Sequence, residues 1–149
     1  MNLKKRALFY ISVKAAIWDK HNRFLILKSL SKSKYFCGRY DLPGGTIDFD
    51  EINTDFQKII RREIREECGP IKYKLRLDPV SLAKYRYSFE HERLYILFEA
   101  KHLAGQIKIS DEHTEFKWIK LTPKNIKKLF HPALRQLLSN YVKWNKIKL

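Results

Sequence analysis

The segment from Gly44 to Pro70 constrains the fold more than any other part of the chain. It begins with two adjacent glycines after a proline, which break any regular strand and allow bare backbone to approach neighbouring groups. Asn53 or Thr54 is predicted to cap a helix that runs to Cys68, and Gly69 with the following proline is predicted to end it. The pattern therefore predicts a glycine turn that leads into one well-delimited helix.

That predicted helix concentrates three glutamates in the run from Arg62 to Gly69, although like charges three or four residues apart repel each other. At about 100° per residue, Glu63 and Glu67 project within about 60° of the apolar side, and Glu66 lies at its edge. Partly desolvated carboxylates are costly unless paired, so either a hard divalent cation or salt bridges to nearby Lys and Arg side chains would account for them. The apolar side of the helix is predicted to comprise Phe56, Ile60, Ile64 and Cys68.

The segment from Gly45 to Pro70 resembles the Nudix box, the signature of hydrolases that act on nucleoside diphosphates linked to another moiety. The family pattern runs Gly, five residues, Glu, a spacer, and then Arg-Glu-aliphatic-x-Glu-Glu-x-Gly-aliphatic. Gly45 and Glu51 match its first half, and "REIREECG" at 62–69 matches its second half without a gap. Ten residues separate Glu51 from Arg62 where the family usually has seven, so the chain carries a three-residue insertion, and proline replaces the final aliphatic residue.

The resemblance implies a metal site on this helix. Glu66 and Glu67 would be the principal ligands of Mg²⁺ or Mn²⁺, with Glu63 as a further ligand or as the base that activates water. The backbone carbonyl of Gly44 would be another ligand, and a side chain at this position would obstruct the site. The residues implied to support the motif are Gly45, Glu51, Arg62 and Gly69.

Two roles have alternative candidates. A more distant acid often completes the family site before a Trp-containing strand, and in "SDEHTEFKWI" the first candidate is Glu112 and the second is Glu115. In the family, the glutamate at the position of Glu51 braces the motif arginine, here Arg62. Because the insertion lengthens this connection, Asp55 could take that part instead.

The implied activity is the divalent-metal-dependent hydrolysis of a diphosphate linkage in a nucleoside diphosphate derivative, with a small nucleotide as substrate. Tyr85 and Tyr87 lie near the position where relatives that cleave dinucleoside polyphosphates have a tyrosine, which makes them candidate substrate-binding residues. Strand tyrosines also commonly pack within a sheet, so this alternative stays open. Further aromatic residues that could stack a base are Trp18, Tyr35, Phe36 and Tyr40.

The net charge of +15 favours polyanions without choosing among them, because the basic residues are spread from Lys4 to Lys148. It leaves two alternatives: an enzyme that removes pyrophosphate or a cap from an RNA 5′ end, or a Nudix domain that only binds a nucleotide or RNA. Retention of all three motif glutamates argues against a domain that only binds. The sequence does not fix the oligomeric state, so a homodimer is compatible with it.

The whole chain, 1–149, is predicted to form a single domain of α+β class, because strand and helix signals alternate without a linker or repeat. The resemblance implies a Nudix-like α/β/α sandwich with a mixed β-sheet between helices. Strands are expected at 8–18, 23–29, 71–77, 80–89, 93–100 and 115–121. The apolar stripe of a terminal helix is predicted to comprise Phe130, Leu134, Leu137, Leu138, Tyr141 and Val142.

Two cysteines, Cys37 and Cys68, are too few for a disulfide framework and lack metal-ligand spacing, which favours a reducing, cytoplasmic setting. The run from Leu8 to Trp18 resembles a signal peptide only superficially, because Lys14 interrupts it and no cleavage site follows. No stretch reaches the roughly 18 apolar residues that a membrane span needs, so no membrane association is expected.

Overall fold

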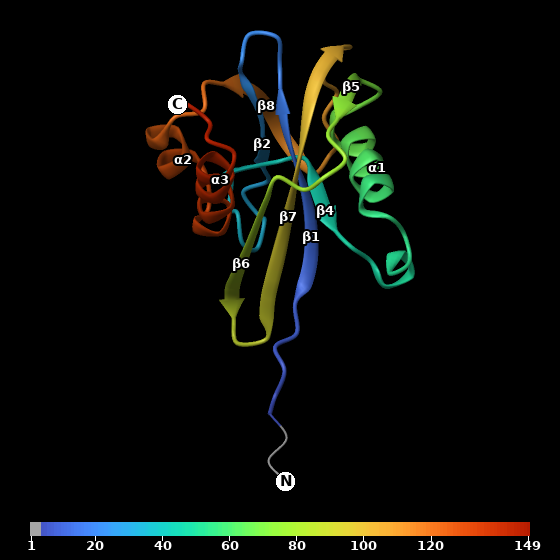
Figure 1. Ribbon diagram of the computed structural model, residues 1–149, viewed down its shortest axis with the longest axis vertical. Helices are drawn as coiled ribbons and strands as arrows, with labels where there is room; N and C mark the ends of the chain where they lie inside the picture. Colours follow the sequence, from blue (N-terminus) through green and yellow to red (C-terminus); the bar gives the residue numbers. More distant parts are fainter. Residues whose placement is uncertain (1–3) are drawn as a thin grey trace.

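The β-branched and aromatic runs of the chain assemble into one mixed sheet, with α1 on one face and α2 and α3 on the other (Figure 1). The computed structural model describes residues 4–149. Its strands are β1 (Tyr10–Trp18), β2 (Phe24–Ser29), β3 (Tyr40–Asp41), β4 (Gly44–Thr46), β5 (Lys72–Leu75), β6 (Ser81–Ser88), β7 (His91–Ala104) and β8 (His113–Ile119). Its helices are η1 (Phe49–Glu51), α1 (Phe56–Cys68), α2 (Pro123–Leu129) and α3 (Pro132–Trp144). The α+β sandwich expected from the sequence is confirmed.

The sheet is built around a parallel pair, β1 and β7, which stay in register from Tyr10–Arg93 to Trp18–Lys101. The main strand order is β3-β2-β1-β7-β5, with β4 paired to β1, β6 to β7 and β8 to β2. All of these other ladders are antiparallel. β7 has 14 residues, longer than the predicted 93–100, because its first half pairs with β6 and its second half pairs with β5.

Alternation along β1 divides the core into two layers. Val13, Ala15 and Ile17 are completely buried in the cluster that includes the apolar side of α1. Ala16 belongs to the other cluster, which includes α3, and Trp18 packs against that cluster. Successive strand residues face opposite sides of a sheet, so one strand contributes to both layers.

The helix that carries the motif glutamates begins one or two residues later than expected. Asp55 occupies its N-cap, whereas the prediction of Asn53 or Thr54 is wrong. Phe56, the first helical residue, is 37% exposed and does not belong to the buried face, where Ile59 replaces it. The other end is confirmed: α1 stops at Cys68 and the next residue, a glycine, has a φ of 82°.

The C-terminal region contains two helices instead of one. Thr122 caps α2 by accepting a hydrogen bond from the amide of Asn125 at 3.1 Å. Phe130 ends α2, and His131 caps α3, whose first residue is Pro132. Proline fits the first position of a helix but not its interior, so the chain must start a new helix here. Phe130 is nevertheless completely buried, as the predicted apolar stripe requires.

Within residues 4–149, no helix is both long enough and apolar enough to cross a lipid bilayer.

Candidate active site

Gly44 and Gly45, the two glycines of the turn, have no room for a side chain, because each lies close to a different neighbouring group. β4 pairs with β1, and a Cβ on Gly44, whose φ is 143°, would overlap the carbonyl oxygen of Val13. The backbone of β1 therefore already excludes a side chain at Gly44, and the expectation that such a side chain would obstruct a metal site stays a prediction. At Gly45 a Cβ would lie 2.5 Å from Oε1 of Glu63, so this glycine allows the α1 carboxylate to approach the turn.

Glu63 and Glu67 lie one helical turn apart on α1 and are both buried beside the glycine turn. Oε2 of Glu67 accepts a hydrogen bond from the amide of Gly44 at 2.7 Å, and burial raises the pKa of this carboxyl to about 8. Burial also raises the pKa of Glu63, although the guanidinium of Arg62, 3.2 Å away, acts in the opposite direction. Each carboxylate would gain from a nearby cation, since desolvation disfavours its charged form.

Arg62 joins the two halves of the motif. Its Nη2 donates to both carboxylate oxygens of Glu51, at 2.7 and 3.0 Å, and its Nη1 donates to Glu66 at 3.1 and 3.2 Å. Although burial acts against it, hydrogen bonding from Arg62 lowers the pKa of Glu51. Arg62 therefore contacts Glu51, and Asp55 occupies the N-cap position of α1 without a side-chain hydrogen bond to the helix. Residues 52–55 form the connection between η1 and α1.

Glu66 differs from the other two motif glutamates in its surroundings. Its side chain is 56% exposed and lies against Arg62, whereas Glu63 and Glu67 are buried. Within residues 4–149, no three acidic, histidine or cysteine side chains are already gathered around one point.

A buried ion pair lies behind the turn, and the sequence analysis did not identify it. Nζ of Lys14 donates to Oδ2 of Asp41 at 2.9 Å and to the carbonyl oxygen of Leu42 at 3.3 Å. Oδ1 of Asp41 accepts from the amide of Leu42 at 2.7 Å. Lys14 is only 6% exposed, and its charge favours the ionised form of Glu67. The signal in the sequence was a single lysine inside the apolar run of β1.

A cavity of about 430 Å³ opens next to the turn and is lined by Glu112, the first candidate for the distal acid. Its walls include Gly44, Glu67 and Glu112. Glu115 lies on β8 outside this lining, where it accepts a hydrogen bond from Tyr40 and lies 3.6 Å from Nζ of Lys117. The structure thus brings Glu112 to the cavity and directs Glu115 elsewhere. The lining residues are Ser29, Leu30, Lys32, Ser33, Phe36, Asp41, Gly44, Glu67, Glu112 and His113.

His113 lines the same cavity and was not a candidate in the sequence analysis. It is buried, its Nδ1 has no hydrogen-bond partner within residues 4–149, and burial lowers its pKa.

An aromatic cluster extends from the cavity along β6 and contains both candidate tyrosines. The ring of Tyr87 lies 4.4 Å from Tyr35, 5.0 Å from Tyr85 and 5.1 Å from His131, measured between centroids. The cluster reaches the cavity through Phe36, whose ring is 5.6 Å from His131. Sequence spacing gave no reason to group His131 with strand tyrosines, because the α2–α3 turn brings it there.

Tyr87, Tyr40 and Trp18 differ in which of their groups a substrate could contact. The hydroxyl of Tyr87 is hydrogen-bonded to Tyr95, and burial raises the pKa of Tyr87 to about 12, so its ring rather than its hydroxyl is available for contact. Tyr40 is buried, and Trp18 lines a different cavity.

The oxygen donors around the turn have the chemistry that a hard divalent cation prefers. Mg²⁺ binds carboxylate and carbonyl oxygens and usually retains several waters, so it does not need a complete cage of protein ligands. Glu67 is buried beside the turn with Oε2 2.7 Å from the amide of Gly44, so its carboxylate is a donor that a cation would stabilise. The residues present therefore fit such a cation.

Comparisons with known proteins bear on the family and the fold of this chain. A family model described as "NUDIX domain" matches residues 9–141. Among solved structures, a MutT protein from Methanosarcina mazei Go1 is 25% identical, with a TM-score of 0.77 over 96% of this chain and 99% of that one. No curated protein sequence gives a significant match.

Two further solved structures share the fold at lower identity. A C. elegans Ap4A hydrolase binary complex is 19% identical, with a TM-score of 0.70 over 92% of this chain and 98% of that one. The NUDIX domain of Shewanella oneidensis NrtR, complexed with ADP ribose, is 14% identical, with a TM-score of 0.70 over 96% of this chain and 91% of that one.

Proposed function

Because this chain belongs to the Nudix family and is a hydrolase of nucleotide pyrophosphate bonds, we propose that it uses Mg²⁺ or Mn²⁺ to cleave the diphosphate linkage of a nucleoside diphosphate derivative. The observation that carries this proposal is the pair of buried carboxyls, Glu63 and Glu67, beside a glycine turn and an open cavity. Burial disfavours the charged form of both carboxyls, so a bound cation would stabilise them beyond what Arg62 and Lys14 already provide.

Four groups would hold the cation: the carboxylates of Glu66, Glu67 and Glu112 and the backbone carbonyl of Gly44. The cation supplies positive charge that offsets the diphosphate and makes a water molecule more acidic. Glu63 would accept the proton of the attacking water, since its raised pKa brings the carboxyl closer to the operating pH of a general base. Alternatively, Glu63 would serve as a further ligand.

The aromatic cluster would bind the nucleoside part of the substrate. Tyr85 and Tyr87 would present ring faces for stacking, and Phe36 would form the boundary with the phosphate cavity. Similar structures include an Ap4A hydrolase and a domain complexed with ADP ribose, which supports a nucleotide rather than another phosphoric anhydride. A planar base stacked here would leave its phosphates beside the glycine turn.

A metal-dependent phosphate-release screen tests the proposal. The substrates are nucleoside triphosphates, nucleotide sugars, ADP-ribose, dinucleoside polyphosphates and 5′-triphosphorylated RNA, each with Mg²⁺, Mn²⁺ or EDTA. Glu67→Gln should lose most turnover while its circular dichroism stays unchanged. Asp78→Asn is the matched control, because Asp78 is exposed between β5 and β6 and should remain active. Near-normal Mg²⁺-dependent activity of Glu67→Gln would overturn the metal assignment.

The distal ligand is tested in the same screen. Glu112→Gln should reduce turnover, because Glu112 lines the cavity with Glu67, whereas Glu115→Gln should have little effect. The reverse ranking would move this role to Glu115.

RNA 5′ ends remain a second substrate class, favoured by the net charge of +15. Product release from 5′-triphosphorylated RNA that exceeds release from every free nucleotide would select this class. Tight RNA binding without product from any diphosphate would instead support a domain that only binds.

A further inference from the structure

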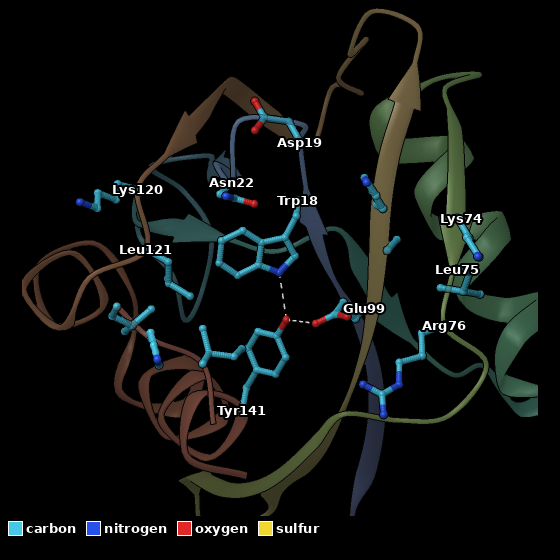
Figure 2. Close-up of a pocket in the computed structure, with 15 residues that line it drawn as sticks. Trp18, Asp19, Asn22, Lys74, Leu75, Arg76, Glu99, Lys120, Leu121 and Tyr141 are labelled. Carbon is cyan, nitrogen blue, oxygen red and sulfur yellow. Dashed lines mark hydrogen bonds between the residues drawn. The ribbon is translucent and has the colours of Figure 1, made fainter. Parts of the chain in front are cut away.

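A second cavity, larger than the one beside the glycine turn, lies at the far end of the β1–β7 pair (Figure 2). Its volume is about 720 Å³, and it shares no lining residue with the candidate active site. On β1 it is reached at Trp18, four residues beyond Lys14, which corresponds to about 13 Å of extended chain. The two cavities are therefore separate.

The aromatic wall of this cavity is held by a chain of hydrogen bonds. Nε1 of Trp18 donates to the hydroxyl of Tyr141 at 2.9 Å, and that hydroxyl donates to the carboxylate of Glu99. In Figure 2 the indole of Trp18 lies above the ring of Tyr141, Glu99 lies beside the tyrosine hydroxyl, and Leu121 lies on the other side of the indole. Because the indole is fixed in this way, a flat apolar molecule would meet a preformed surface.

The rest of the lining is strongly cationic. Its two acidic side chains are fewer than its basic ones: Asp19 pairs with Arg23 at 2.8 Å, and Glu99 accepts a hydrogen bond from Tyr141 and keeps its negative charge. The basic side chains that line the cavity are Lys74, Arg76, Lys101, Lys120 and Lys148. None of these five makes an ion pair with an acid of the described chain, residues 4–149. The local excess of positive charge favours an anionic ligand.

Arg76 is the best placed of these cations. Its backbone amide donates to the carbonyl oxygen of Glu99 at 2.9 Å, which anchors the start of the side chain to β7. In Figure 2 its guanidinium extends toward the space beside Glu99 and Tyr141. A guanidinium can bind a carboxylate or phosphate through two parallel hydrogen bonds, which a lysine cannot do.

We propose that this cavity binds a small organic anion with a flat apolar body. The body would pack against Trp18 and Leu121, and its carboxylate, sulfonate or phosphate would be bound by Arg76 and Lys101. The volume lies within the roughly 300 to 1,000 Å³ of small-molecule pockets, whose apolar walls carry a few polar groups. This site is separate from the proposed hydrolytic site and does not depend on it.

The experiment uses the full chain and 8-anilinonaphthalene-1-sulfonate, a fluorescent aromatic anion, as the probe. Titration at about 0.15 M salt, with stoichiometry from calorimetry, should give one saturable site. Arg76→Gln/Lys101→Gln should weaken binding about tenfold or more, because the double variant removes the anion contacts. Lys127→Gln/Lys128→Gln is the matched control, since these exposed α2 lysines lie outside both cavities and the net charge changes equally. The control should bind like wild type.

Three results would overturn the proposal: no saturable binding by the wild-type chain, equal weakening in both double variants, or displacement of the probe by the nucleotide that the enzyme hydrolyses. The first would mean that the cavity does not select aromatic anions, the second that attraction is only general, and the third that the probe occupies the active site. Unchanged turnover of Arg76→Gln/Lys101→Gln would support the separation of the two sites.

Discussion

Binding of Mg²⁺ is expected to strengthen as the pH rises, because Glu67 must lose a proton before it can bind a cation. The carboxyl is 5% exposed, and its pKa is raised to about 8 by burial, an effect that Lys14 and the Gly44 amide partly offset. A group with this pKa is roughly 90% protonated at pH 7. The apparent affinity should therefore rise about tenfold from pH 6 to pH 7 and level off above roughly pH 8.5.

Isothermal titration calorimetry with MgCl₂ measures the affinity for the cation and the number of protons released when it binds. Titrations at each pH in two buffers with different ionisation enthalpies give the number of protons released, which should be about 0.9 per cation at pH 7. Glu67→Gln carries no proton to release, so its residual binding should lose this pH dependence. Proton release near zero in wild type, or the same pH slope in Glu67→Gln, would refute the assignment of a buried, protonated Glu67 at the metal site.

Three further outcomes follow from the same contacts. Folding raises the pKa of Glu67 from 4.5 to about 8, so the stability that this group contributes is complete below pH 4.5 and is lost as the pH rises through about 8. The total loss in the free energy of unfolding should be about 5 kcal/mol. Thermal melts of metal-free protein should show this loss, and excess Mg²⁺ at pH 8 should reverse it. Lys14→Met leaves Asp41 buried and unpaired, so urea unfolding should show that the free energy of unfolding falls by about 3 to 5 kcal/mol. The double variant Lys14→Met/Asp41→Leu should recover most of this stability. Equal losses of stability in the two variants would contradict the ion-pair account. Gly45→Ala puts a Cβ 2.5 Å from Oε1 of Glu63. This variant should lower turnover and Mg²⁺ affinity with little change in melting temperature. Wild-type kinetics would mean that the carboxylate of Glu63 moves aside freely.

Local signals in the sequence were sufficient for the end of the motif helix and for most of the sheet. Gly69 and the following proline marked the end of α1, β-branched and aromatic side chains marked β1, and alternation marked β5. The face of α1 that carries Glu63 and Glu67 was also correct, because helical geometry fixes which residues share a side.

The contacts that complete the site could not be derived in this way, because they join segments far apart in the chain. Lys14 meets Asp41 only because the turn between β3 and β4 folds against β1. His131 joins the tyrosines of β6 only because α3 packs on that strand. Periodicity also could not choose between Glu51 and Asp55 as the partner of Arg62, since that choice depends on where the loop returns.

The central position of β1 explains how one small sheet can carry two independent cavities. Lys14, Ala16 and Trp18 share one face of the strand, so the ion pair behind the turn and the wall of the larger cavity are only a few residues apart. Ala16 lies between them, completely buried, in a part of β1 that is paired with β7. The roughly 13 Å of strand exceeds the Debye length of about 8 Å at physiological salt, so the cations around Trp18 should contribute little to binding of phosphates beside Lys14. The two sites thus share a rigid strand while their charges act separately.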